Sequence, residues 1–192
     1  MPQLDDVITY LEMRQKPAAP APPAPAGLKL ALVRAEHCTV SFYRYLYETV
    51  GTPWLWYERR LLPDADLAAL IQKPTTEIFV LYAGGVPAGY FELDTAGSRE
   101  TELCYFGLVP EFIGRRLGPF LLRAAIDQAW LRPLDRLWVH TRNYDHPKAL
   151  GNYQRAGFVV YARQKLRFED PRSRGILPRD LKNPRLPPLE GG

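Results

Sequence analysis

The stretch ELCYFGLVPEFIGRRLGPFLL, residues 102–122, decides the fold of this 192-residue chain. A strand runs into a short loop that contains Gly114 and Gly118, and the loop leads directly into a helix. Such a junction presents backbone N–H groups at a helix N-terminus, which favours an anion. Arg115 and Arg116 add positive charge beside it. The stretch indicates a phosphate or pyrophosphate site, although a plain turn with two exposed arginines explains these residues equally well.

Strand-like and helix-like segments alternate on both sides of this junction, and Gly84 and Gly85 predict a tight turn between two strands. The order of segments mixes hairpins with crossovers. It therefore predicts an α/β fold with a mixed, mostly antiparallel central sheet of about six or seven strands and helices on both faces. Strands are expected over residues 29–34, 77–82, 86–94, 100–109, 134–141 and 158–168, and helices over 39–50, 64–71, 117–131 and 147–156.

Proline marks the ends of the folded region, because six of the 19 prolines lie in residues 1–27 and five in residues 169–192. Residues 17–27 are proline, alanine and a final glycine, which predicts an extended linker. We therefore expect an N-terminal helix and Pro/Ala linker over residues 1–27, one domain over residues 28–168, and a Pro/Arg-rich C-terminal tail over residues 169–192. The tail is expected to wrap the domain or to be mobile.

The segment before the linker has apolar residues at Leu4, Val7, Ile8 and Leu11. This spacing predicts a short amphipathic helix over residues 4–13. Such a helix can dock on its own domain or across a dimer, which leaves a homodimer open.

Composition excludes several classes of protein. Hydrophobic residues make up 46% and charged residues 24% of the chain, as in soluble globular proteins. No apolar run approaches the roughly 18 residues that a membrane span needs, and the first residues are acidic, unlike a secretory signal. Cys38 and Cys104 are too few for a disulfide framework, and neither they nor the three dispersed histidines have metal-site spacing. These features predict a cytoplasmic protein without a membrane segment or a metal.

The net charge of +4 comes from the C-terminal end. Residues 161–192 carry eight basic and four acidic residues, so the other 160 residues sum to zero. A basic strip over residues 163–185 could contact nucleic acid, but a solvated charged tail is the commoner case. Nucleic-acid association is therefore kept as an alternative and not as the main hypothesis.

The junction resembles the cofactor-binding motif of the GNAT superfamily, the acyl-CoA-dependent N-acyltransferases. The family pattern Gln/Arg-x-x-Gly-x-Gly/Ala falls on Ile113, Arg116 and Gly118, and it matches at Gly118. A second family pattern, Ala-x-x-x-Tyr-x-x-x-Gly-Phe, matches fully within DHPKALGNYQRAGF, residues 145–158. Two motifs at the expected separation are more specific than either alone, and the resemblance extends over about residues 29–168.

The resemblance implies that acetyl-CoA is the acyl-donor co-substrate. It would lie in a V-shaped opening between the strand that ends at Val109 and the strand over residues 137–141. Arginine at position 116, where the family has glycine, should weaken or alter binding, because its Cβ hinders close approach while its guanidinium adds a phosphate contact. The implied cofactor-binding residues are Leu108, Val109, Ile113, Gly114, Arg115, Arg116, Leu117, Gly118 and His146.

Two catalytic residues follow from the same resemblance. Tyr153 matches the tyrosine that protonates the leaving CoA thiolate in many members, and a phenol can serve as such an acid. Glu102 has the position of the glutamate that part of the family uses as general base. Alternation along the strand places Glu102, Cys104 and Phe106 on one face. A buried structural tyrosine and a solvated strand carboxylate are the alternatives, and Cys104 as a nucleophile is weakly supported because no histidine partner is defined.

The acceptor pocket is expected in the variable segment after the first helix. Trp54, Trp56 and Tyr57 there can bind an apolar or cationic amine, although core packing explains them as well. The resulting hypothesis is an N-acetyltransferase that moves an acetyl group from acetyl-CoA to a primary amine, on a small molecule or a protein, by direct attack. The alternatives are a non-catalytic CoA-binding or partner-binding module and a nucleic-acid-associated protein.

Overall fold

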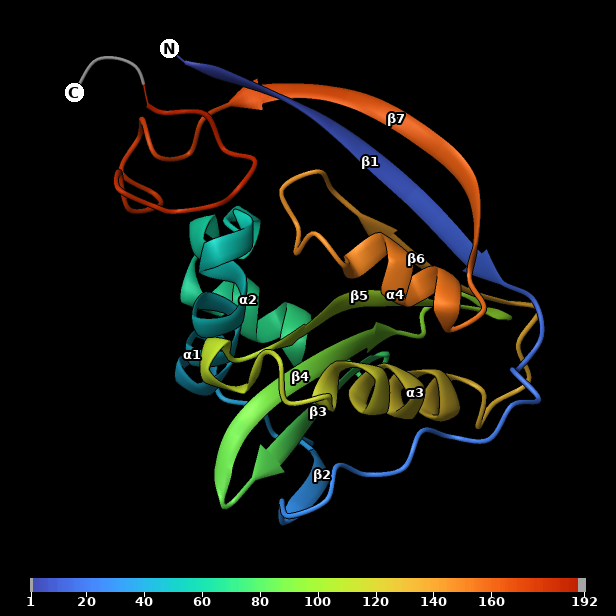
Figure 1. Ribbon diagram of the computed structural model, residues 1–192. Helices are drawn as coiled ribbons and strands as arrows, with labels where there is room; N and C mark the ends of the chain where they lie inside the picture. Colours follow the sequence, from blue (N-terminus) through green and yellow to red (C-terminus); the bar gives the residue numbers. More distant parts are fainter. Residues whose placement is uncertain (1, 190–192) are drawn as a thin grey trace.

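A computed structural model describes residues 2–189, and one seven-stranded sheet is its central element (Figure 1). Neighbouring strands are antiparallel except for β5 and β6, which are parallel. The mixed, mostly antiparallel sheet expected from the sequence is thus confirmed. In spatial order the strands are β2 (Leu30–Arg34), β3 (Thr76–Ala83), β4 (Val86–Asp94), β5 (Glu100–Leu108), β6 (Arg136–Thr141), β1 (Gln3–Met13) and β7 (Val159–Glu169).

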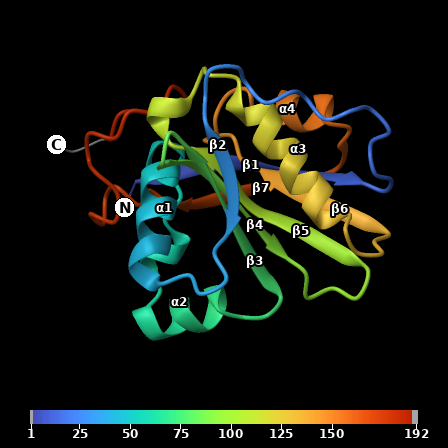
Figure 2. The same ribbon diagram turned by 90° about the horizontal axis from the view of Figure 1, so that it is seen from below.

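Helices cover both faces of the sheet, as Figure 1 and Figure 2 show. A hydrophobic core lies on each face of the sheet, and alternate side chains of β3 contribute to both. Ile78 and Val80 pack against α1 and α2, whereas Phe79 and Leu81 pack on the face of α3 and α4. Among the described residues, no helix has the length and apolar content needed to cross a membrane. The α-helices are α1 (Val40–Gly51), α2 (Asp64–Ile71), α3 (Leu117–Ala129) and α4 (Ala149–Arg155), and the short 3₁₀ helices are η1 (Thr52–Trp54), η2 (Glu58–Leu61) and η3 (Pro110–Phe112).

The N-terminal segment is strand β1, so the helix expected over residues 4–13 is wrong. Its buried positions are close to the alternation of a strand, but two of them, Asp6 and Thr9, are polar. Because these two buried positions are polar, the sequence does not show the alternation of apolar and polar residues that is typical of a strand. The remaining apolar residues have a spacing that resembles that of a helix. Backbone partners on both sides, in β6 and β7, then favour the strand over a local helical preference.

Strand β1 lies between β6 and β7, and Leu11 pairs with Val139 on one side and with Val160 on the other. Figure 1 shows β1 and β7 curving side by side across the top of the molecule. The first strand of the chain therefore joins two of its last strands in one sheet.

The Pro/Ala segment lies against α3. Lys16 Nζ is 3.0 Å from Asp127 Oδ1, and Arg123 Nη1 donates a hydrogen bond of 2.5 Å to the carbonyl of Ala19. The segment is extended, as its composition predicts, and it is tied to the helix by these polar contacts.

The C-terminal segment that follows β7 wraps the domain near the N-terminus (Figure 1). Leu177 is buried with Leu4, Leu55 and Tyr144, and the amide N–H of Asp170 donates to the carbonyl of Pro2 at 2.9 Å. Wrapping is thus the arrangement seen for residues 170–189, whereas the division of the chain into three parts stays a prediction.

Candidate active site

A cavity opens where β5 and β6 separate. Their parallel pairing ends at Leu103 and Val139, although both strands continue further. A β-bulge in β5 coincides with this point, because Leu93 pairs with Leu103 while Glu92 pairs with Tyr105. A bulge bends its strand and increases the local twist. The strands therefore diverge and leave a cavity of about 620 Å³ between them.

The bulge also changes the alternation expected along β5, so placing Glu102, Cys104 and Phe106 on one face is wrong. Phe106 pairs with Phe91 and packs in the core on the α3 side, beside Tyr153. Glu102 instead contacts His140 of β6. One extra residue in a strand shifts every later side chain to the other face.

One end of the cavity is formed by the loop that connects β5 to α3. Gly114 has a φ of 86° and Arg116 a φ of 62°, and both line the cavity. The left-handed backbone at Arg116 is the conformation that glycine adopts without strain and that an arginine adopts at a cost of about 1–2 kcal/mol. The chain thus keeps a glycine-like turn at the start of α3 with a cationic side chain on it.

The structure brings most of the implied cofactor residues to this cavity but not all of them. Val109 is buried in the α1 side core, Leu117 is buried in the α3 side core, and the Arg115 guanidinium lies 5.1 Å from the centre of the Phe112 ring. Their side chains are not part of the lining. Those that do line it are Leu108, Ile113, Gly114, Arg116, Gly118 and His146.

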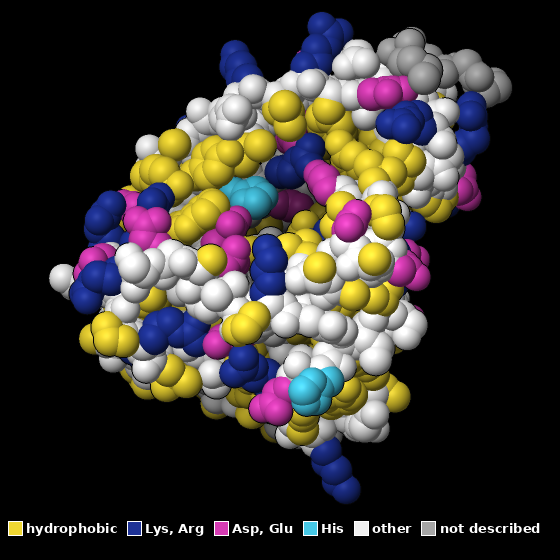
Figure 3. Space-filling model, turned by 180° about the vertical axis from the view of Figure 1, so that it is seen from behind, with side chains coloured by type: hydrophobic (Ala, Val, Ile, Leu, Met, Phe, Trp, Pro, Cys, Tyr) yellow, Lys and Arg dark blue, Asp and Glu magenta, His cyan; other side chains and the backbone are white. Residues whose placement is uncertain are grey.

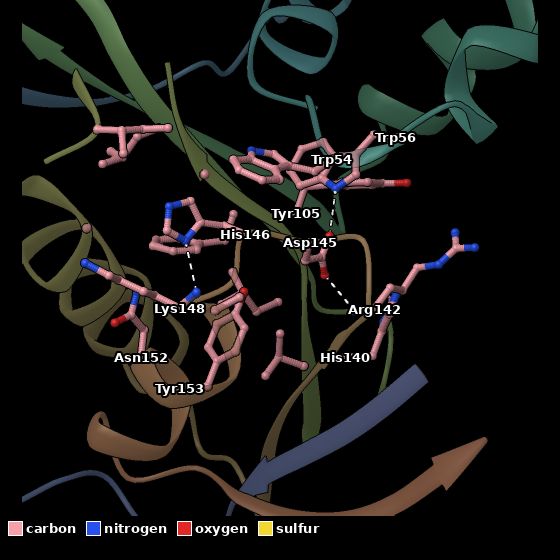
Figure 4. A pocket seen from close by; sticks show the side chains of 18 of the residues that line it. Trp54, Trp56, Tyr105, His140, Arg142, Asp145, His146, Lys148, Asn152 and Tyr153 are labelled. Carbon is pink, nitrogen blue, oxygen red and sulfur yellow. Dashed lines mark hydrogen bonds between the residues drawn. The ribbon is translucent and has the colours of Figure 1, made fainter. Parts of the chain in front are cut away.

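Two further cations, Lys148 and Arg155, line the cavity with Arg116. His146 lies next to them, and burial together with the Lys148 charge lowers its pKa, so its imidazole is neutral. The backbone N–H of Lys148 donates to His146 Nδ1 at 3.1 Å, which leaves the Nε2–H as a donor (Figure 4). This part of the cavity offers positive charge and hydrogen-bond donors, as an anionic ligand requires.

Tyr153 of α4 lines the cavity and is otherwise buried. Its ring meets Phe106 and Phe158 edge-on, with centroids 6.1 and 5.9 Å away. Burial and the nearby Asp145 carboxylate raise the pKa of the Tyr153 phenol. The hydroxyl group is therefore protonated at neutral pH and available as a donor.

Glu102 does not line the cavity, but its partner His140 does. Glu102 Oε1 lies 3.3 Å from His140 Nδ1, so the carboxylate orients the imidazole. The predicted base is thus connected to the cavity through a histidine that the sequence alone did not connect to it.

The other end of the cavity is aromatic and carries carboxylates. Trp56 and Tyr105 line it, and their ring centroids are 5.0 Å apart. Trp54 lies between the two ends, because its ring centroid is 5.0 Å from that of His146. Tyr57 lies elsewhere and stacks on Phe168. On the face seen in Figure 3 the surface is hollowed, and hydrophobic, acidic, basic and histidine side chains surround the hollow.

Asp145 and Arg142 are cavity residues that the sequence reasoning missed. Arg142 Nε donates to Asp6 Oδ2 at 2.6 Å, and its Nη1 donates to Glu58 Oε1 at 2.7 Å. Asp145 lines the cavity and is half-buried, and this burial raises its pKa. The sequence indicates Asp145 as a site residue only weakly, because Asp145 directly precedes His146 in the matched motif but is not one of the motif positions.

A buried ion pair supports the aromatic end. Arg59 forms two bonds of 2.7 Å with the Glu92 carboxylate, which also accepts the Tyr43 hydroxyl at 2.8 Å. The guanidinium lies 4.5 Å from the centre of the Tyr105 ring. These contacts position Tyr105 at the cavity wall.

Cys104 lines the cavity, but burial raises the pKa of its thiol, so the thiolate that a nucleophile needs is not formed near neutral pH. Burial likewise raises the pKa of Cys38 to about 11. Neither cysteine has the character of a nucleophile.

Comparison with known proteins points to one family. Residues 40–158, more than half of the chain, match the family model described as the acetyltransferase (GNAT) family. A comparison with curated proteins finds no match.

Several solved structures share the fold. A GCN5-related N-acetyltransferase from Sphaerobacter thermophilus has a TM-score of 0.64 at 17% identity, over 85% of this chain and 51% of that one. One from Kribbella flavida has a TM-score of 0.56 at 17% identity, over 85% and 57%. A spermidine N-acetyltransferase from Vibrio cholerae, solved with CoA and spermine, has a TM-score of 0.57 at 23% identity, over 69% and 82%. The chain spans only 51% to 63% of the length of six of the structures that it matches.

Proposed function

The chain belongs to the GNAT acetyltransferase family, and from this premise we propose that it transfers an acetyl group from acetyl-CoA to a primary amine by direct attack. One observation carries the proposal. A single cavity in the gap between β5 and β6 is cationic at one end and aromatic with carboxylates at the other, and Tyr153 and His140 line it. Two substrates of opposite charge can therefore meet in it.

The cationic end suits the phosphates of acetyl-CoA. Arg116, Lys148 and Arg155 supply positive charge, and the neutral His146 supplies a donor. The first N–H groups of α3 lack helical acceptors and are available to the pyrophosphate. The thioester end of this substrate would then extend into the gap between the strands.

The chemical step needs an acid and a base but no covalent enzyme intermediate. A proton leaves the acceptor ammonium toward His140, whose imidazole Glu102 orients. The nitrogen lone pair attacks the thioester carbonyl and a C–N bond forms. The nitrogen then releases its second proton to solvent as the C–S bond breaks. The departing thiolate takes the proton of Tyr153, which solvent restores, so the products are an amide and free CoA. Holding amine and thioester together supplies much of the rate.

Calorimetry with acetyl-CoA at near-physiological salt tests the proposal first. We expect micromolar affinity, followed by amine-dependent release of free thiol in a screen of primary amines. Thiol release without amine is the control for hydrolysis. Absence of binding up to millimolar acetyl-CoA would reject the proposal in favour of a partner-binding module.

The role of Arg116 can be tested separately with Arg116→Gly. The backbone at this position already has the glycine-like conformation, so the substitution chiefly removes a cation. We expect the affinity for acetyl-CoA to fall about five- to tenfold, equivalent to roughly 1 kcal/mol for a charge-assisted contact. Arg115→Gln is the matched control, because its side chain lies on Phe112 outside the cavity lining, and its affinity should change less than about twofold. A steep gain in affinity for Arg116→Gly would instead indicate a degenerate cofactor site.

The basic C-terminal strip gives little support to nucleic-acid association. Arg172 is buried against Asp170 at 2.6 Å, and Arg185 Nη1 donates to the carbonyl of Asn143 at 2.9 Å. These cations are used within the chain, so the strip offers fewer charges to phosphates than its sequence indicates.

A further inference from the structure

We propose that Asp145 binds the ammonium group of the acceptor, and that the acceptor is therefore an aliphatic amine that is protonated at neutral pH. This inference rests on the proposed function and adds the substrate class and the residue that selects it.

Asp145 is held rigidly by one of its oxygens. Oδ2 accepts the Thr141 hydroxyl and the backbone N–H of Arg142, each at 2.7 Å. Oδ1 accepts the indole N–H of Trp56 at 3.4 Å, which is a long contact. One oxygen therefore fixes the side chain, while the other keeps acceptor capacity toward the cavity that Asp145 lines.

The neighbouring carboxylates are already engaged with partners on the protein. Glu58 Oε1 pairs with Arg142 at 2.7 Å, and its Oε2 accepts the backbone N–H of Tyr57 at 3.2 Å. Glu102 pairs with His140, and Asp6 with Arg142. Of the two carboxylates that line the cavity, Glu58 and Asp145, Asp145 is the one that has no side-chain cation at hydrogen-bond distance among the described residues.

The charge of Arg142 acts on Asp145 and lowers its pKa in part, but the guanidinium is bonded to Asp6 and Glu58 and forms no ion pair with Asp145. The other titratable groups that line the cavity around Asp145 are the Tyr153 and Tyr105 phenols, the Cys104 thiol, the neutral His146, and His140, with Lys148 toward the cofactor end. A half-buried carboxylate without a counter-ion is energetically costly, and an entering cation reduces that cost.

The surroundings of Asp145 favour an ammonium ion over other donors. Figure 4 shows Trp54, Trp56 and Tyr105 gathered on one side of the carboxylate. Aromatic faces attract cations, and the attraction strengthens where water is excluded. The apolar surfaces of these rings also accommodate the methylene chain of an aliphatic amine. The carboxylate and the aromatic rings together therefore favour a cation that carries an apolar chain.

The test compares Asp145→Asn with wild type on two amines of similar size. Propylamine is a cation at neutral pH, whereas 2,2,2-trifluoroethylamine is largely uncharged. We expect the KM for propylamine to rise about 10- to 100-fold in the variant, since a hydrogen bond to a charged group is lost. The KM for trifluoroethylamine should change less than about threefold, because no charge is neutralised.

Glu111→Gln is the matched control. It removes one negative charge from an exposed position in η3 outside the cavity lining and should leave both KM values unchanged. The melting temperature and the acetyl-CoA affinity of Asp145→Asn show whether the variant folds. An equal rise in KM for both amines, or the same rise in both variants, would assign Asp145 a structural role and overturn the inference.

A binding measurement keeps the inference separate from the proposed activity. In the presence of CoA, propylammonium should bind wild-type protein in calorimetry, and the affinity should fall at least tenfold in Asp145→Asn. Binding with this difference but without thiol release would reject the activity and support the inference. Turnover of propylamine with unchanged KM in Asp145→Asn would reject the inference and support the activity. Absence of both binding and turnover would reject both.

Discussion

Tyr153→Phe is expected to lower kcat about 100-fold or more while leaving the affinity for acetyl-CoA within about twofold. The ring packs against Phe106 and Phe158, and phenylalanine keeps this packing. The substitution removes the hydroxyl group alone, which is the donor proposed for the leaving thiolate. Steady-state rates and calorimetry on the same preparation measure the two effects separately.

The pH profile adds a second readout for Tyr153. Burial and the Asp145 charge raise its pKa, so the protonated form persists to higher pH than in an ordinary tyrosine. Deprotonation of Tyr153 should therefore lower kcat only at a pH above the usual pKa range of a phenol. Tyr161→Phe, at an exposed site outside the cavity lining, is the control and should behave as wild type. A parallel loss of turnover and acetyl-CoA affinity in Tyr153→Phe would show that the tyrosine is structural.

Glu92→Gln is expected to lower the free energy of unfolding by about 3–5 kcal/mol. The substitution leaves the shape nearly unchanged but removes the charge that neutralises Arg59, whose side chain is 11% exposed. An uncompensated buried guanidinium is the cause of this large effect. Urea denaturation of both proteins, with comparison of the slopes, gives the difference directly.

Asp135→Asn provides the matched control for Glu92→Gln. Asp135 pairs with Arg99 at 2.6 Å, but both side chains are more than half exposed. Water screens such a pair, and its loss should leave the free energy of unfolding nearly unchanged. Similar effects in the two variants would contradict the role assigned to burial.

Because Arg59 lies over Tyr105, Glu92→Gln should also weaken amine binding.

Two features of this protein were predictable because local sequence determines them. The strand, loop and helix over residues 102–122 follow from glycines and apolar periodicity, and the placement of Tyr153 at the cavity follows from its motif. The cation at position 116 was visible in the sequence, and the structure shows that it occupies the glycine-like backbone conformation.

Other features depend on distant parts of the chain. Strand β1 forms because β6 and β7 supply its backbone partners, which no window of residues 4–13 contains. The bulge opposite Glu92 decides where β5 leaves β6, and nothing local marks it. Arg59 and Glu92 are 33 residues apart in sequence, and their pairing appears only when η2 lies on the sheet. Burial in the folded protein raises the pKa of Asp145, and the amino-acid composition does not reveal this burial.

The position of β1 has a consequence for how the protein is made. Its residues leave the ribosome well before those of its partner β7, because Tyr10 of β1 contacts Gln164 of β7 across 154 positions of sequence. Contacts of such long sequence separation form slowly, because the loop entropy is lost before the contacts are gained. Since Asp6 of β1 anchors Arg142 at the cavity, the candidate site is complete only after β1 has joined the sheet. A newly synthesised chain should therefore acquire secondary structure well before it acquires activity.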